Sequence, residues 1–106
     1  MNYKTVIKNF EIGNKANAGN YLTDGNALFL FGNRIAEKRS DGIYFSLAGY
    51  ETSTTTKALN QISGLRVSRS KGKITANGIE IDSTKWYNVN KIKDNTDAEK
   101  ILGEMK

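Results

Sequence analysis

The side chains best suited to chemistry in this sequence are the five hydroxyl groups at positions 52–56, within the stretch YETSTTTKALNQ. A Ser or Thr directly before an amphipathic helix is a typical N-cap, because its oxygen accepts a hydrogen bond from an amide two or three residues further on. We expect Thr54 or Thr55 to fill that role. Hydroxyls beside a helix N-terminus can also hold an anion, so Thr54, Thr55 and Thr56 are candidate anion contacts.

The chemistry available to these hydroxyl groups is limited, because the sequence contains neither cysteine nor histidine. Without cysteine there is no thiolate metal site and no cysteine nucleophile. Without histidine the usual general base near neutral pH is missing. Glu80 and Asp82 have the spacing that puts both on one face of a strand, but no further magnesium ligand gathers around them. We therefore expect no enzyme, no cofactor and no metal site.

The basic residues suggest an acidic partner. Sixteen Lys and Arg residues against eleven Asp and Glu give a net charge of +5, which favours nucleic acid or an acidic protein surface. The densest basic stretch, RVSRSKGK, is a predicted hairpin that can follow a phosphate backbone or can be a solvated tip without a partner. Its cations are Arg66, Arg69, Lys71 and Lys73.

A second basic group consists of Arg34, Lys38 and Arg39 around Glu37, and it is the weaker candidate. An exposed Tyr50 or Trp86 would be able to stack on a base. Most aromatic residues of a small domain lie in its core. We accordingly expect three of them in the interior, namely Phe29, Phe31 and Trp86.

Short strands separated by glycine turns dominate the predicted secondary structure. Gly stands beside Asn, Asp or Lys at several points, a pattern typical of tight turns. The intervening segments are rich in β-branched and aromatic residues and predict strands over 27–31, 34–39, 43–47, 65–69, 73–76, 79–81 and 86–89. Residues 3–12 fit a strand, which we favour, although Val6, Ile7 and Phe10 also fit one stripe of a helix.

Two helices complete the prediction. One spans residues 54–63 with Ala58, Leu59 and Ile62 on one face, and one spans residues 96–105 behind a capping box. The chain length suits a single domain over residues 1–106. The expected fold is α+β, a twisted antiparallel sheet of about five to seven strands with the first helix after the third or fourth strand and the C-terminal helix packed on one face.

One set of residues resembles a known pattern, in which a GN…IA stretch precedes GY-x-T-x-TT-x-x-LN and a strand pair ends with a Gly and a Trp. The residues that match are Asn20, Gly32, Ile35-Ala36, Gly49-Tyr50, Thr52, Thr55-Thr56, Leu59-Asn60, Gly78 and Trp86. The pattern is similar to that of a family of small, functionally unassigned proteins from tailed bacteriophages. The resemblance covers residues 18–89 and transfers no catalytic residue.

The resemblance implies a phage protein that acts in the cytoplasm of an infected bacterium. The sequence has no signal-peptide pattern, and its longest apolar run is too short to cross a bilayer, so we expect a soluble protein without a membrane partner. The first hypothesis is an accessory protein that binds and inhibits a host protein or protein–nucleic-acid complex, for instance a CRISPR effector. Alternatives are a direct DNA or RNA binder, using the basic hairpin with Tyr50, and a sponge for a signalling nucleotide. The sequence leaves the oligomeric state open.

Overall fold

The computed structural model describes residues 2–92 and opens with a helix, α1 (Tyr3–Ile12). Its stripe of Val6, Ile7 and Phe10 is fully buried, whereas the residues between these positions face solvent or the rim of the core. The prediction of a strand over residues 3–12 was therefore wrong. Three buried side chains at helical spacing cover more core than the alternate face of a strand would.

Both ends of α1 have a specific stop. The side-chain oxygen of Asn2 accepts a hydrogen bond from the amide of Thr5 at 3.1 Å, and Gly13 ends the helix with φ of +90°. The turn at Gly25 packs against this end so closely that a Cβ there would lie 2.6 Å from the Gly13 carbonyl oxygen. A side chain at position 25 would push the sheet away from α1.

Antiparallel strands form two sheets within residues 2–92. The main sheet contains, in spatial order, β1 (Ala16–Ala18), β2 (Tyr21–Thr23), β3 (Ala27–Leu30), β4 (Asn33–Arg39), β5 (Gly42–Phe45) and β9 (Tyr87–Asn88). The small sheet contains β6 (Val67–Ser70), β7 (Lys73–Ala76) and β8 (Ile79–Ile81). The seven strands predicted over residues 27–89 each have a counterpart; β7 and β8 have the predicted bounds, and the other five differ at one or both ends. The three-residue strands β1 and β2 were not predicted.

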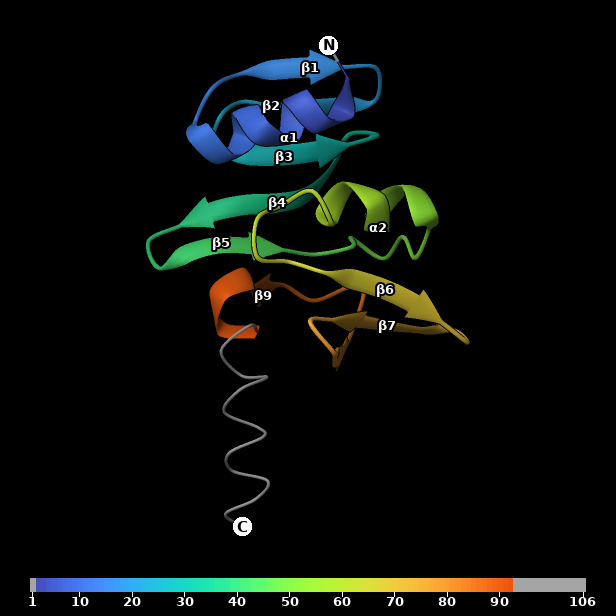
Figure 1. Ribbon diagram of the computed structural model, residues 1–106. Coiled ribbons are helices and arrows are strands. Elements are labelled where there is room, and N and C mark those ends of the chain that lie inside the picture. The colour runs from blue at the N-terminus through green and yellow to red at the C-terminus, as the bar shows by residue number, and fades with distance from the viewer. Residues whose placement is uncertain (1, 93–106) are drawn as a thin grey trace.

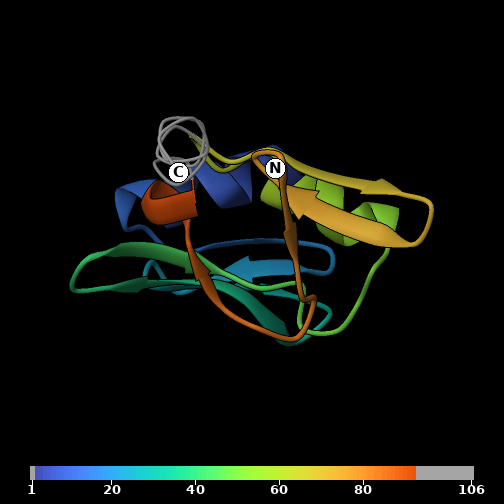
Figure 2. The ribbon, with the colours of Figure 1, turned by 90° about the horizontal axis from the view of Figure 1, so that it is seen from below.

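The second helix, α2 (Ser53–Leu59), follows β5 and ends four residues before the predicted boundary at 63. Both helices lie on one face of the main sheet, with the small sheet beside α2 (Figures 1 and 2). The opposite face of the main sheet is covered by no helix of the described chain. A helical turn over residues 89–92 follows β9. The helix expected over 96–105 lies outside the described residues.

One hydrophobic core joins both sheets. Phe45 and Leu28 of the main sheet and Leu59 of α2 are fully buried, and Ile74 and Ile81 of the small sheet belong to the same cluster. The fold is α+β, with a single core shared by all these elements. Among residues 2–92, no helix combines the length and hydropathy that a membrane span requires.

Candidate functional site

The hydroxyl run forms the start of α2, and its N-cap is Thr52 rather than Thr54 or Thr55. The Thr52 hydroxyl accepts a hydrogen bond from the amide of Thr55 at 3.2 Å and lies 3.1 Å from the Thr55 hydroxyl. The Thr56 hydroxyl donates to the backbone oxygen of Ser53 at 3.0 Å. Thr55 and Thr56 are both buried. Two of the three predicted anion contacts are thus already bonded within the helix start.

A small cavity opens beside this helix start. It measures about 220 Å³, and none of its lining side chains is charged. The floor is apolar, and Tyr50 forms part of the rim with 53% of its surface exposed. The residues that line the cavity are Leu30, Phe31, Asn33, Ile35, Leu47, Tyr50, Thr52 and Thr55. The motif that carries the resemblance therefore contributes four residues to this cavity, namely Ile35, Tyr50, Thr52 and Thr55.

Phe31 forms the opposite rim and was wrongly placed in the interior by the sequence, since 62% of its surface is exposed. It occupies the turn between β3 and β4, where Phe31 has φ of +53° and Gly32 has φ of +79°. Two positive φ values define a type I′ turn, which favours Asn or Asp over a bulky aromatic residue. An exposed aromatic ring is held here in a strained backbone conformation.

The exposed Phe31 also borders a wider groove of about 530 Å³ on the side of β2 and β3. Leu22 lines this groove and is 45% exposed. We call Leu22, Phe31 and Tyr50 the tip patch. These three account for most of the large hydrophobic side chains that are exposed within residues 2–92; the other is Ile12, on α1.

The uncovered face of the main sheet carries arginines stacked on aromatic rings. The Arg34 guanidinium carbon lies 5.5 Å from the centroid of the Phe29 ring. The Arg39 guanidinium carbon lies 4.0 Å from the centroid of the Tyr44 ring and 5.5 Å from that of Trp86. Phe29, Tyr44 and Trp86 are each partly exposed. Together with Glu37, these five residues form what we call the arginine–aromatic face.

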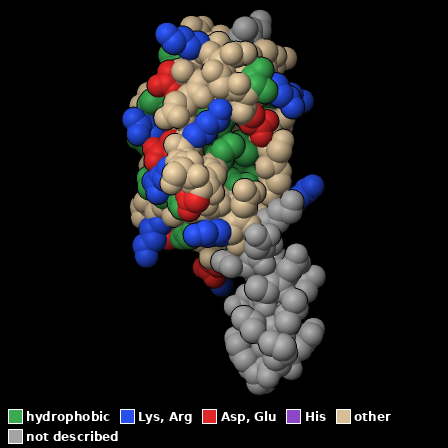
Figure 3. Space-filling view, turned by 90° about the vertical axis from the view of Figure 1, so that its left-hand side faces the viewer, with side chains coloured by type: hydrophobic (Ala, Val, Ile, Leu, Met, Phe, Trp, Pro, Cys, Tyr) green, Lys and Arg blue, Asp and Glu red, His purple; other side chains and the backbone are tan. Residues whose placement is uncertain are grey.

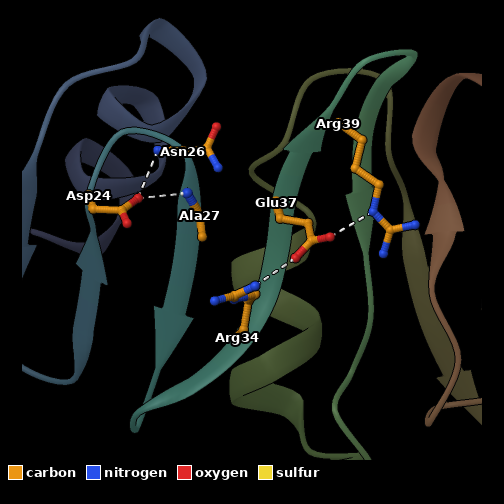
Figure 4. A network of polar contacts seen from close by, with 6 residues as sticks. All are labelled: Asp24, Asn26, Ala27, Arg34, Glu37 and Arg39. Atoms are coloured by element: carbon orange, nitrogen blue, oxygen red, sulfur yellow. Dashed lines mark hydrogen bonds and ion pairs between the residues drawn. The ribbon is translucent and has the colours of Figure 1, made fainter.

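Glu37 links the two arginines (Figure 4). One carboxylate oxygen lies 3.0 Å from Arg34 Nη1 and the other lies 2.6 Å from Arg39 Nε. The hydrogen bond from Arg39, and then that from Arg34, lowers the pKa of Glu37 despite the opposing effect of burial. The side chain of Glu37 is 17% exposed, whereas those of Arg34 and Arg39 are 54% and 40% exposed. Each guanidinium therefore keeps further N–H donors toward solvent.

A β-bulge places Arg34 and Glu37 on the same face. Residues three apart on a regular strand point to opposite faces, but the register between β3 and β4 shifts between Leu28 and Phe29, leaving Ile35 as the extra residue. Lys38 marks the other face, because its Nζ lies 5.6 Å from the centroid of the Phe10 ring on α1. Of the three cations that the sequence grouped together, Arg34 and Arg39 thus lie on one face of the sheet and Lys38 on the other.

Asp24, also shown in Figure 4, has a structural role at the turn before β3. Its carboxylate accepts hydrogen bonds from the amides of Asn26 and Ala27, each at 2.8 Å. These bonds, the one from Asn26 first, lower the pKa of Asp24. Asp24 therefore stabilises this turn and is not part of a candidate site.

Three cations of the β6–β7 hairpin, Arg69, Lys71 and Lys73, line a small cavity of about 170 Å³ together with Glu51, whereas Arg66 lies outside it. All four hairpin cations are exposed. Arg69 pairs with buried Ile74 and lies on the inner face, where it donates to the backbone oxygen of Glu51 at 3.0 Å. Lys73 pairs with Ser70, so strand alternation puts it on the outer face.

Charge is also mixed on the end of the molecule seen in Figure 3, where Lys and Arg side chains alternate with Asp and Glu around a small hydrophobic area. Over residues 2–92, no three acidic side chains come together as a metal site would require. Asp82, one of the two carboxylates considered for magnesium, instead accepts hydrogen bonds from the amide and hydroxyl of Thr84.

Sequence reasoning missed the arginine–aromatic face, although one signal was present. A two-residue turn at Phe31-Gly32 predicts the pairing of Phe29 with Arg34, which the structure shows. The contact of Arg39 with Trp86 carried no such signal, because it depends on β5 and β9 lying side by side.

Comparison with known proteins gives one match. Residues 3–97 match the model of a protein family described as "Kyanoviridae Gp96 protein". This range extends beyond the predicted resemblance at both ends and includes α1. No curated protein and no solved structure matches the chain.

Proposed function

The chain belongs to the Kyanoviridae Gp96 protein family, a family of phage proteins, and on this premise we propose that it is a non-enzymatic accessory protein that binds a host protein through the tip patch. Binding takes place in the cytoplasm of the infected bacterium and inhibits or modulates the partner. A nucleic-acid-directed defence system, such as a CRISPR effector, is the class of partner that the phage setting favours.

The observation that carries this proposal is the exposure of Phe31 at a strained turn. A Phe with φ of +53° costs stability that Asn at the same position would not cost. Exposed aromatic side chains are enriched in protein interfaces, where they supply most of the binding energy. A binding role gives Phe31 a reason to be there that the fold alone does not give.

The cavity between Phe31 and Tyr50 supports a protein as the partner. Its volume of about 220 Å³ is below the roughly 300–1,000 Å³ typical of small-molecule sites. Its lining is uncharged, with an apolar floor, so it suits one apolar or aromatic side chain better than a phosphate-bearing ligand. The hydroxyls of Thr55 and Thr56 are already hydrogen-bonded within the helix start, which also argues against a nucleotide sponge at this site.

The test is affinity capture from nuclease-treated lysate of the bacterial host, comparing the wild-type chain with Phe31→Asn. Asparagine accepts positive φ, so the variant should fold at least as stably as the wild type while losing the ring. We expect the wild type to retain one host protein at a stoichiometric level and Phe31→Asn to lose it. Thermal unfolding of both proteins checks the fold.

Ile12→Asn is the matched control, because Ile12 is 63% exposed, as Phe31 is at 62%, yet lies on α1. It should retain the partner. If the wild type holds no protein above background, or if both variants lose the partner equally, the tip patch is not a binding site for a host protein.

A further inference from the structure

We propose that the arginine–aromatic face binds single-stranded nucleic acid, a function separate from protein binding at the tip patch. The face comprises Phe29, Arg34, Glu37, Arg39, Tyr44 and Trp86. It lies on the side of the main sheet that no helix of the described chain covers, so a strand of nucleic acid has access to it.

The stacked side chains supply a surface for bases. Nucleobases stack on aromatic rings and on the planes of arginine guanidinium groups. The Arg39 guanidinium lies 4.0 Å from the centroid of the Tyr44 ring and 5.5 Å from that of the Trp86 ring, and 40% of its side chain is exposed. A base that stacks on the exposed part of this cluster extends an existing stack.

Charge complementarity selects nucleic acid as the occupant. Arg34 and Arg39 each use one guanidinium nitrogen on Glu37, and their remaining N–H groups suit phosphate oxygens, to which arginine bonds with charge-assisted geometry. The chain as a whole carries a net charge of +5, which attracts a polyanion.

The arrangement favours single strands over duplexes. In a duplex the bases are stacked on each other, so their flat faces do not meet a protein surface. Phe29 lies opposite Arg34, and Tyr44 lies opposite Glu37 two strands away from Phe29. Two strand spacings and a rise of two residues along β3 put these two positions roughly 12 Å apart, so a bound strand crosses β3, β4 and β5 diagonally.

Glu37 acts here as a positioning residue. Its two ion pairs hold both guanidinium groups over the rings, which limits the rotamer freedom that binding would otherwise remove. The β-bulge at Ile35 is what allows one carboxylate to reach both arginines.

The experiment titrates the full chain with single-stranded oligothymidylate and follows the fluorescence of Trp86, which is the one tryptophan of the sequence. Stacking of a base near Trp86 should change its emission. Repeating the titration at several salt concentrations gives the slope of log K against log salt. Each neutralised phosphate of a single strand contributes about 0.7 to this slope.

The decisive variant is Arg34→Gln with Arg39→Gln. We expect it to weaken binding about tenfold or more and to reduce the salt slope by roughly 1.4. The control is Arg66→Gln with Lys71→Gln, which removes the same charge from the hairpin and should leave the slope nearly unchanged. Phe31→Asn should also bind as the wild type does, since the tip patch is a separate surface.

Arg39→Lys separates stacking from charge. Lysine keeps the positive charge but lacks the planar group, so affinity should fall several-fold while the salt slope stays constant. Far-UV circular dichroism and thermal unfolding verify that each variant folds. If the double variant does not fold, two measurements decide: the affinity of Arg39→Lys and the change in Trp86 emission of the wild type.

Three results would overturn the proposal. The first is no binding of oligothymidylate at low salt, which would leave the face as an ion-paired cover of the sheet or a protein contact. The second is an equal decrease of the salt slope in the two double variants, which would indicate that binding depends on the overall charge of the protein and not on this face. The third is tighter binding of duplex than of single-stranded DNA.

Discussion

The main sheet and the small sheet both present arginines or lysines on short antiparallel strands, but they surround them differently. Arg34 and Arg39 of the main sheet lie against aromatic rings and share Glu37. The strands of the small sheet contain no aromatic residue, and their cations point to opposite faces. The denser basic sequence thus forms the less organised surface, because strand alternation separates neighbours along the chain and strand pairing joins distant ones.

The largest expected effect concerns whether the two sheets form one cooperative unit. Phe45 of the main sheet is fully buried in a cluster that also contains Ile74 of the small sheet. Phe45→Ala should lower the free energy of unfolding by about 3–5 kcal/mol, measured by urea denaturation. Amide exchange should accelerate in β7 as well as in β5. Unchanged exchange in β7 would mean that the small sheet is an independent unit.

The next effect tests the link between α2 and the small sheet. The Asn60 side chain donates to the Val67 carbonyl at 2.9 Å and accepts from the Val67 amide at 2.6 Å, closing the free edge of β6. Asn60→Ala should cost about 1–2 kcal/mol and increase amide exchange in β6 more than in β4. The exposed neighbour variant Gln61→Ala should stay within about 0.5 kcal/mol of the wild type. An equal increase of amide exchange in β6 and β4 would contradict a local link between Asn60 and β6.

A smaller effect is expected at the start of α2, which lies between the two sheets. Thr52→Ala removes the N-cap hydroxyl and should cost about 1 kcal/mol, as measured by chemical denaturation. Thr54→Ala provides the comparison within the same hydroxyl run and should cost less. If Thr54→Ala proves the more damaging, the cap assignment is incorrect.

The smallest effect is a pH dependence of the arginine–aromatic face. Because the folded-state pKa of Glu37 lies below its ordinary value of 4.5, its ion pairs add stability above that value, and this contribution is lost as pH falls through the lowered folded-state pKa. The melting temperature of Glu37→Gln should therefore lie below that of the wild type at neutral pH, and the difference should shrink in acid. A constant difference across the acid range would mean that the carboxylate charge is not involved.

Much of the fold could be predicted from the sequence. The alternation and turn residues of β3 to β8 repeat over short distances, so local patterns locate these strands. The helix at residues 3–12 was mistaken for a strand because the segment can also be read with period two, although Val6, Ile7 and Phe10 fit one stripe of a helix. The short strands β1 and β2 carry few β-branched residues and are held mainly by their pairing and by α1.

The candidate sites were predicted less well. Tyr50 was correctly singled out as potentially exposed, but Phe31 was placed in the core because hydrophobicity alone says nothing about a turn at the sheet edge. The role of Thr52 as N-cap was missed by two or three residues, since any hydroxyl in the run satisfies the same local pattern. Whether the basic hairpin binds a partner stays a prediction.

By itself the sequence located the strands from β3 to β9 and the helix α2, because their patterns depend on residues that are neighbours along the chain, and it excluded chemistry that needs cysteine or histidine. Only the tertiary structure decided which side chains share a surface. The bulge at Ile35 brings Arg34 to the face of Glu37, and the pairing of β5 with β9 brings Trp86 within reach of Arg39. Both depend on the register between strands, and a shift of one residue would send each side chain to the opposite face.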